Sequence, residues 1–402
     1  MKIGIVSPFR AADLAELLDS SSQEELAGLG GASATPVFPL AREWHRRGHS
    51  VAVFCFEPSA SRIHTLRGNR LVIHVIPKRR ARRCLLDFYR TECRLMRELV
   101  GREKPDVLTA QWTYDHALAA LQCGIPTAVT CHDPPWRCAW IIKSLFAAYH
   151  VAVAWHVIRH ADRLICVSPY TARHIQRYFR PRCPLDVVPN GLGPEVFARR
   201  ERRLGSPAAP ERALTLCNVG GWGEIKNVTT LLLAFALVRA KKPAAKLALF
   251  GCGLGPAQAA ETWARHRNLQ QGVVFNGAVP YARVLDFLER EAGLMVHPSL
   301  VEAHGMVLVE AMACGVPAIG GSRSGAVPWT LEEGRSGYLC DVRNPRALAD
   351  TIIKAIEAPD RNQAMVEHAW ISARQRFNQE QAAAANESIL QLLWASKRHT
   401  VP

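Results

Sequence analysis

The sequence predicts an α/β protein built from two parallel-sheet domains. Short apolar runs rich in β-branched residues recur along the chain, and helix-type segments separate them. The runs form two series, divided by a stretch rich in proline and charge. Alternation of strand and helix is typical of a doubly wound parallel sheet covered on both faces. A length of 402 residues is sufficient for two such domains.

The first series defines an N-terminal domain over residues 1–193. Its expected strands are 2–6, 51–56, 71–76, 107–110, 127–131, 163–167 and 185–188. Each run is four to six residues long and mainly apolar, which is typical of strands buried on both faces.

The second series defines a C-terminal domain over residues 213–378. Its expected strands are 214–219, 246–250, 273–275, 294–297, 318–319 and 338–340. Residues 194–212, which include Pro207 and Pro210 among many charges, are interpreted as the linker. The apolar-periodic helix expected at about 379–397 is predicted to pack back on the first domain.

The stretch 299–317, S-L-V-E-A-H-G-M-V-L-V-E-A-M-A-C-G-V-P, is the most informative in the chain. Gly305 can end a loop, and the following residues are strong helix formers until Gly315. Glu310 has apolar neighbours on almost every side, and a buried carboxylate is costly without a partner. A helix N-terminus beside it is a ready anion site.

Two interpretations of these carboxylates stay open from the residues alone. In the first, Glu302 and Glu310 bind a ligand that carries both hydroxyls and phosphate. In the second, Glu302 is a solvated loop residue and Glu310 pairs with a buried arginine.

The Glu-x7-Glu spacing of Glu302 and Glu310, with the sequence around it, resembles family 4 of the retaining glycosyltransferases. The resemblance implies the GT-B fold, two Rossmann-like domains that face each other across a cleft. It also implies transfer of a sugar from a nucleotide diphosphate sugar to a hydroxyl acceptor, such as a glycan, a glycolipid or a lipid-linked intermediate.

Site residues follow from matching motifs along the chain. Adjacent glycines let backbone N–H groups approach an anion, and Gly30-Gly31 matches the family's glycine loop facing the donor phosphates. His132 follows an expected strand, where the family places a histidine near the donor sugar. The resemblance implies a catalytic set of His132, Glu302 and Lys226. It implies a nucleotide-sugar-binding set of Gly30, Gly31, Lys226, His304, Gly305, Met306, Val307 and Glu310.

Individual roles can be assigned within these sets. Lys226 follows a strand and several glycines at a helix start, and the resemblance assigns it to the donor diphosphate. Glu302 would hold the sugar and Glu310 the ribose hydroxyls. The glycines of 251–255 lack the G-x-G-x-x-G spacing, so a nicotinamide enzyme is not expected. The nucleoside is expected near residues 276–279.

Three positions depart from the family pattern. Gly221 replaces a usual arginine, Trp329 replaces the glutamate of a Pro-Glu pair, and His304 stands where an aromatic residue is usual. Two alternatives therefore remain: a non-catalytic relative that binds nucleotide sugars, or another retaining enzyme of the fold such as a phosphorylase. No Asp-x-Asp motif is evident, so neither a bound metal nor a cofactor other than the donor is expected.

Charge and cysteine usage give the expectations for partners and location. The net charge is +15, and residues 1–200 hold 28 Lys+Arg against 17 Asp+Glu. Its densest run comprises Lys78, Arg79, Arg80, Arg82 and Arg83. Apolar residues follow this run, which fits either contact with an anionic membrane surface or a solvated face. No nucleic-acid motif is present, and the scattered cysteines indicate cytoplasmic, reduced thiols, with peripheral contact to the inner membrane face as an option.

Overall fold

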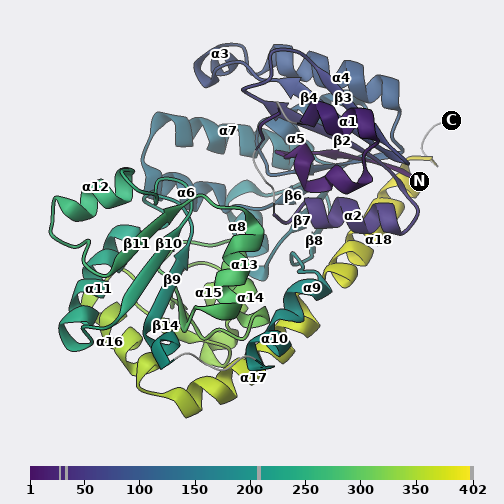
Figure 1. The fold of residues 1–402 in the computed structure, drawn as a ribbon. Coiled ribbons are helices and arrows are strands. Elements are labelled where there is room, and N and C mark those ends of the chain that lie inside the picture. The colour runs from purple at the N-terminus through teal and green to yellow at the C-terminus, as the bar shows by residue number, and fades with distance from the viewer. Residues whose placement is uncertain (27–28, 32–34, 206–209, 399–402) are drawn as a thin grey trace. The chain divides into compact units, whose positions relative to one another are not determined.

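The computed structural model describes residues 1–26, 29–31, 35–205 and 210–398 (Figure 1). The chain divides into two compact units. The first comprises residues 1–139, 143–191 and the C-terminal segment from Gln379. The second comprises Leu192–Asn378 and the three residues Trp140–Ile142. Both units are α/β, as the sequence predicts.

The first unit contains an eight-stranded sheet among its described residues, in the order β3-β4-β2-β1-β5-β6-β7-β8. Its strands are β1 (Lys2–Val6), β2 (Ser50–Glu57), β3 (His64–Gly68), β4 (Leu71–Pro77), β5 (Val107–Gln111), β6 (Thr127–Cys131), β7 (Arg163–Cys166) and β8 (Leu185–Val187). All pairs are parallel except β3 with β4. The sequence did not reveal β3, because this edge strand is mostly polar and buries only Leu66 completely.

Helices cover both faces of this sheet. They are η1 (Ala11–Leu17), α1 (Ser20–Glu25), α2 (Phe38–Arg46), α3 (Ala81–Leu86), α4 (Arg90–Glu103), α5 (Asp115–Ala120), η3 (Leu121–Cys123), α6 (Pro135–Ile142), α7 (Leu145–His160), α8 (Pro169–Phe179) and α18 (Gln379–Arg398). One core joins the sheet to α4, α5 and α7, and the other joins it to α2 and α18. The Trp44 indole N–H donates to the Ala383 carbonyl at 3.1 Å, which ties α2 to α18 within this unit.

The second unit contains a six-stranded, fully parallel sheet in its described part, in the order β11-β10-β9-β12-β13-β14. Its strands are β9 (Thr215–Val219), β10 (Lys246–Phe250), β11 (Val273–Gly277), β12 (Leu294–His297), β13 (Ala318–Gly321) and β14 (Tyr338–Cys340). The sheet order changes direction between β9 and β12, and ligands of open α/β sheets bind at such a point.

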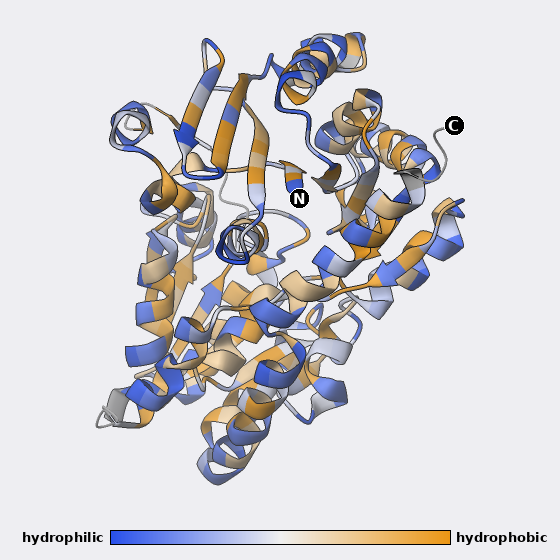
Figure 2. Ribbon diagram, turned by 90° about the vertical axis from the view of Figure 1, so that its right-hand side faces the viewer, coloured by the Kyte–Doolittle hydropathy of each residue, from blue (hydrophilic) through white to orange (hydrophobic). Residues whose placement is uncertain are grey.

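Its helices again form two layers. They are α9 (Pro194–Phe197), α10 (Arg199–Gly205), η4 (Pro210–Leu214), α11 (Val228–Lys241), α12 (Ala259–Arg265), α13 (Tyr281–Arg290), α14 (Met306–Ala313), α15 (Val327–Thr330), η5 (Glu332–Gly334), α16 (Pro345–Ile356) and α17 (Pro359–Arg376). One core lies under α11 and α16, and the other under α13, α14 and α17. Figure 2 shows orange along many strands, whereas many helices carry both orange and blue, as expected for elements with one buried face.

The segment interpreted as a linker, 194–212, forms α9 and α10 and belongs to the second unit. Arg199 pairs with Asp286 at 2.9 Å and with Glu289 at 2.8 Å, and Arg202 also pairs with Glu289, at 2.9 Å. These charges therefore fasten α10 to α13, which explains why a charged segment is ordered. Residues 206–209 lie outside the described residues.

Candidate active site

Glycines let two strand ends meet at the carboxyl edge of the second sheet. Gly251 follows β10 with φ +131°, and a Cβ there would lie 1.4 Å from the Gly220 carbonyl oxygen, after β9. The Trp222 N–H donates to the Cys252 carbonyl at 2.8 Å. The close approach of these two backbones therefore explains part of the glycine content of residues 251–255. No dinucleotide-binding role is needed to explain it.

The loop after β9 brings Lys226 to Glu302. The Lys226 ammonium Nζ lies 2.6 Å from Glu302 Oε1. The Leu300 N–H donates to the Ile225 carbonyl at 2.8 Å, and the Ser299 hydroxyl donates to the same carbonyl at 3.1 Å. Backbone contacts thus hold the two loops together. The interpretation of Glu302 as a solvated loop residue is wrong, because its side chain is only 14% exposed and ion-paired.

His297 is a third member of this group, and sequence reasoning missed it. It ends β12, is buried, and places Nε2 2.9 Å from Glu302 Oε1. A carboxylate only accepts, so Nε2 carries the proton and donates. Burial raises the pKa of Glu302, but the Lys226 charge and the His297 hydrogen bond outweigh it and hold that pKa far below its usual range. The position of His297 at the end of an expected strand, like that of His132, could have identified it.

Glu310 has a tyrosine as its partner. It lies on α14, which follows Gly305 (φ +87°), and its side chain is buried. The Tyr281 hydroxyl, on α13, donates to Glu310 Oε1 at 3.1 Å. Burial raises the pKa of Glu310 to about 7, although the tyrosine hydrogen bond opposes the shift. The arginine partner considered from the sequence is wrong for the described structure, and a carboxyl with one donor retains capacity for more.

Two departures from the family pattern lie side by side. The ring of His304 lies 5.7 Å from that of Trp329 and 4.9 Å, edge-on, from that of Phe377. The Arg376 guanidinium covers Trp329 at 4.8 Å. His304 and Trp329 therefore belong to one packed cluster beside the start of α14. Met306 and Val307 lie in the first turn of α14.

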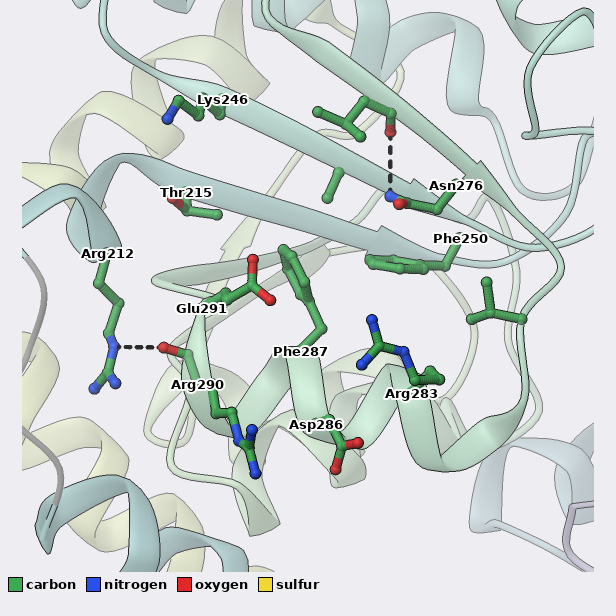
Figure 3. Close-up of a pocket in the computed structure, with 13 residues that line it drawn as sticks. Arg212, Thr215, Lys246, Phe250, Asn276, Arg283, Asp286, Phe287, Arg290 and Glu291 are labelled. Atoms are coloured by element: carbon green, nitrogen blue, oxygen red, sulfur yellow. Dashed lines mark hydrogen bonds between the residues drawn. The ribbon is translucent and has the colours of Figure 1, made fainter.

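A cavity of about 520 Å³ lies between β9–β11 and α13 (Figure 3). Asn276 and Phe250 lie at one end, Arg283 points toward Phe250, and Val279 is also among the lining residues. The lining therefore includes two residues of the segment expected to hold the nucleoside. Tyr281, the partner of Glu310, follows two residues after Val279.

His132 lies on the first unit, at the carboxyl end of β6. Its Nε2 lies 2.8 Å from Gln111 Oε1, and the Gln111 amide donates in turn to the Thr109 hydroxyl at 2.8 Å. The ring packs on Trp112 with a centroid separation of 4.4 Å. Burial lowers the pKa of His132 to about 3. The imidazole is therefore neutral, with Nε2–H donating to Gln111 and Nδ1 left as an acceptor.

Gly30 and Gly31 lie on the same unit. A Cβ on Gly30 would lie 3.0 Å from the Ser59 hydroxyl, and one on Gly31 (φ +141°) would lie 2.8 Å from the Phe9 carbonyl oxygen. Larger residues would clash, so the loop passes close to the ends of β1 and β2. The predicted residues thus form two groups: Gly30, Gly31 and His132 on the first unit, and the others on the second.

Solved structures share this two-sheet fold over nearly the whole chain. Sucrose-phosphate synthase from Thermosynechococcus elongatus matches with a TM-score of 0.79 and 18% identity, covering 98% of this chain and 100% of that one. WaaG, a glycosyltransferase involved in lipopolysaccharide biosynthesis, matches with a TM-score of 0.68 and 16% identity, covering 95% and 98%. Anabaena HepE in complex with UDP and glucose matches with a TM-score of 0.67 and 18% identity, covering 97% and 99%. The fold is GT-B.

Sequence comparison then gives the family. The model "Glycosyltransferase Family 4" matches residues 33–196, and "Glycosyl transferases group 1" matches residues 200–370. The chain belongs to the family 4 glycosyltransferases.

Two curated relatives are more similar to the chain in sequence than these solved structures. N-acetyl-alpha-D-glucosaminyl L-malate synthase from Bacillus anthracis is 26% identical over 302 residues, 73% of this chain and 76% of that protein. A D-inositol 3-phosphate glycosyltransferase from Segniliparus rotundus is 30% identical over 240 residues, 56% of this chain. The match spans about half of that relative, 51%.

Proposed function

We propose that the protein is a retaining glycosyltransferase that moves a sugar from a nucleotide diphosphate sugar to a hydroxyl acceptor. The observation that carries this proposal is the contact of Lys226 and His297 with Glu302, which lies in the loop before α14 and its buried Glu310. It combines a cation from the loop after β9 with the helix start and the two carboxylates of the β12–loop–α14 unit. The HepE complexes with UDP or UDP-glucose favour a uridine donor as the first to test.

In this mechanism the leaving diphosphate gains negative charge as the glycosidic bond breaks. Lys226 and the N–H groups at the start of α14 stabilise that charge. Lys226 exchanges Glu302 for phosphate when the donor enters, and His297 remains to orient the carboxylate toward sugar hydroxyls. Fixed donors of this kind are usually the largest contribution to such a rate enhancement.

The remaining residues bind and orient the donor. Glu310, held by Tyr281, accepts hydrogen bonds from the ribose hydroxyls, and the end of the cavity near Asn276 receives the nucleoside. His132 presents Nδ1 as an acceptor to a sugar hydroxyl. The N–H groups of Gly30 and Gly31 approach the phosphates. This arrangement uses positive charge from the protein itself, so we expect no metal requirement.

The acceptor carries a hydroxyl and is a glycan, glycolipid or lipid-linked intermediate. The names of two relatives contain L-malate and D-inositol 3-phosphate, so these hydroxylated anions are further acceptors to test. Seven of the cysteines are buried thiols, which supports a cytoplasmic location. Within the part of the chain that the structure describes, no helix is both long and apolar enough to cross a membrane. Peripheral contact with the inner membrane face is part of the proposal.

The test is a donor and acceptor panel with the purified chain. UDP-, GDP- and ADP-sugars are incubated with and without acceptor, nucleotide diphosphate release is measured, and the anomeric configuration of the product is read by proton NMR. Acceptor-dependent release with an unchanged configuration supports the proposal, whereas an inverted anomer overturns retention. Binding without release identifies a non-catalytic relative, and phosphate-dependent formation of a sugar phosphate identifies a phosphorylase.

A further inference from the structure

Exposed apolar side chains occur on two segments of the first unit, the end of α3 with the turn after it, and the first turn of α7 (Figure 1). Leu86 is 85% exposed, Phe88 67%, Leu145 92% and Phe146 45%. We call these four side chains the apolar lobe. The Phe88 ring lies 6.0 Å from that of Tyr149, which is one helical turn from Leu145 on α7. Two segments far apart in sequence therefore present one surface.

The backbone of the first segment is fixed in this presentation. Phe88 and Tyr89 both adopt left-handed conformations, with φ of 51° and 59°. Such backbone is strained for bulky residues and persists only where surrounding contacts impose it. Here Tyr89 is buried, and Arg79 spans the turn with ion pairs to Asp87 at 2.8 Å and Glu92 at 2.6 Å. These contacts turn Tyr89 inward and Phe88 outward.

The structure also corrects which basic residues can contact a surface. Lys78 pairs with Asp115 at 2.5 Å, and Arg79 is occupied as described, so these two members of the basic run face inward. Arg80 and Arg83 are exposed on the chain leading to Leu86, and Lys143 is exposed just before Leu145. The side chain of Arg82 lies outside the described residues. Three cations therefore flank the apolar lobe on both segments.

We propose that the apolar lobe, with Arg80, Arg83 and Lys143, docks the first unit onto a bilayer that contains anionic phospholipid. Aliphatic and aromatic side chains enter the boundary between headgroups and acyl chains, while the cations attract lipid phosphates. Asp87, which lies between Leu86 and Phe88 in the sequence, is paired with Arg79 at 2.8 Å, so its charge opposes the attraction less. This proposal rests on the peripheral membrane association proposed above and not on glycosyl transfer. Its test therefore needs no nucleotide-sugar donor.

The experiment is co-sedimentation of the full chain with vesicles of phosphatidylcholine alone or mixed with phosphatidylglycerol. Binding should require the anionic lipid and weaken as salt is added. The charge variant Arg80→Gln/Arg83→Gln/Lys143→Gln should lose on the order of a hundredfold in apparent affinity, about fivefold per cation. The apolar variant Leu86→Ser/Phe88→Ser/Leu145→Ser should lose binding at all salt concentrations. Melting temperatures should not fall, because every substituted side chain is exposed.

Matched control variants use exposed residues elsewhere on the same unit. Arg102→Gln/Arg173→Gln/Arg182→Gln removes three cations, and Tyr178→Ser/Leu392→Ser removes two exposed apolar side chains. Both should bind like the wild type, and loss in the controls equal to that in the test variants overturns the proposal. Wild-type sedimentation that does not depend on anionic lipid also overturns the proposal. A dimer that only the apolar variant disrupts overturns it too, and identifies a second copy of the chain as the partner that covers the apolar lobe. If the chain transfers sugar but does not bind vesicles, the membrane-docking proposal is wrong and the proposed function is unaffected.

Discussion

Lys226 Nζ lies 2.6 Å from Glu302 Oε1, and the same oxygen accepts the His297 Nε2–H at 2.9 Å. One carboxylate oxygen thus links the loop after β9 to the end of β12. The ion pair satisfies both charges while no donor is bound. In the proposed function a diphosphate would compete with Glu302 for Lys226, and phosphate binding would then release the carboxylate toward the sugar.

Replacing Lys226 should affect both affinity and stability. Lys226→Ala leaves a buried carboxylate with His297 alone, so UDP affinity should fall by tenfold or more, and the free energy of unfolding at pH 7 by about 1–3 kcal/mol. The native pKa of Glu302 is depressed, so its stabilisation is present above about pH 4.5 and is lost as pH falls below it. Below about pH 4.5 the free energy of unfolding of Lys226→Ala should therefore fall less steeply with decreasing pH than that of the wild type. Urea denaturation against pH and calorimetry with UDP measure both effects.

Lys242→Ala is the matched control, because Lys242 also pairs with a glutamate, Glu357, at 2.8 Å, but that glutamate is 54% exposed. Its removal should change stability by less than about 1 kcal/mol and leave UDP affinity unchanged. Wild-type UDP affinity in Lys226→Ala would take this residue out of the donor site.

His297 should act on the sugar step more than on the nucleotide. His297→Phe keeps an aromatic ring but removes the donor to Glu302. We expect kcat to fall by roughly tenfold to a hundredfold, with UDP affinity nearly unchanged, because a hydrogen bond to a charged carboxylate contributes about 1.5–3 kcal/mol. His297→Asn retains an N–H donor and should recover part of the loss. Equal losses in UDP binding and kcat would indicate a merely structural histidine.

Gln111 should fix the tautomer of His132. Nitrogen NMR of the imidazole should show a protonated Nε2 and a bare Nδ1, as the 2.8 Å contact with Gln111 Oε1 implies. Gln111→Leu removes that acceptor, so the tautomers should mix and kcat/KM should fall by about three- to tenfold. Gln111→Glu keeps an acceptor but adds charge, which should raise the pKa of His132 from about 3. A wild-type spectrum with Nδ1 protonated contradicts this arrangement.

Chelation tests the expectation that no metal takes part. Incubation with EDTA followed by gel filtration should leave turnover within about twofold, because Lys226 and helix N–H groups supply the positive charge. Loss of activity that Mg²⁺ or Mn²⁺ restores would show that a metal ion shares this role.

The sequence predicted strands where a continuous apolar run is buried on both faces, as in β6 (Thr127–Cys131) and β10 (Lys246–Phe250). It missed β3, which pairs with β4 at the edge of the sheet, because the residues of β3 do not form a continuous apolar run. The same contrast holds at the site. Glu302 and Glu310 are visible because their spacing is local, eight residues along one loop and helix.

Their partners are set by tertiary structure. Lys226 lies 76 residues from Glu302, and Tyr281 lies 29 residues from Glu310. No local pattern marks such pairs. His304 and Trp329 are two departures from the family pattern that lie far apart in the sequence. In the fold their rings are in contact within one packed cluster, which the sequence does not reveal.

Glu310 gives the sharpest test, because its pKa of about 7 makes stability and binding respond oppositely to pH. The native carboxyl binds a proton more tightly than the unfolded one. Its contribution to stability is therefore full below about pH 4.5 and is lost, by roughly 3 kcal/mol, as pH rises through 7. Glu310→Gln removes this loss, so the variant should match or exceed the wild-type melting temperature at pH 8. In the proposed ribose site the hydroxyls donate to the charged carboxylate, so wild-type UDP affinity should rise through pH 7.

In Glu310→Gln that rise should disappear, and UDP affinity at pH 8 should fall by tenfold to a hundredfold, since a hydrogen bond to a charged group contributes about 1.5–3 kcal/mol. Tyr281→Phe is the control. It removes the 3.1 Å hydrogen bond and keeps the ring, so the pKa of Glu310 should rise further and the pH at which UDP affinity increases should move upward with it. Calorimetry across this pH range measures all three proteins. Parallel pH profiles in the wild type and Glu310→Gln would remove Glu310 from the ribose site, and a sharp drop in the melting temperature of Glu310→Gln would assign it a structural role instead.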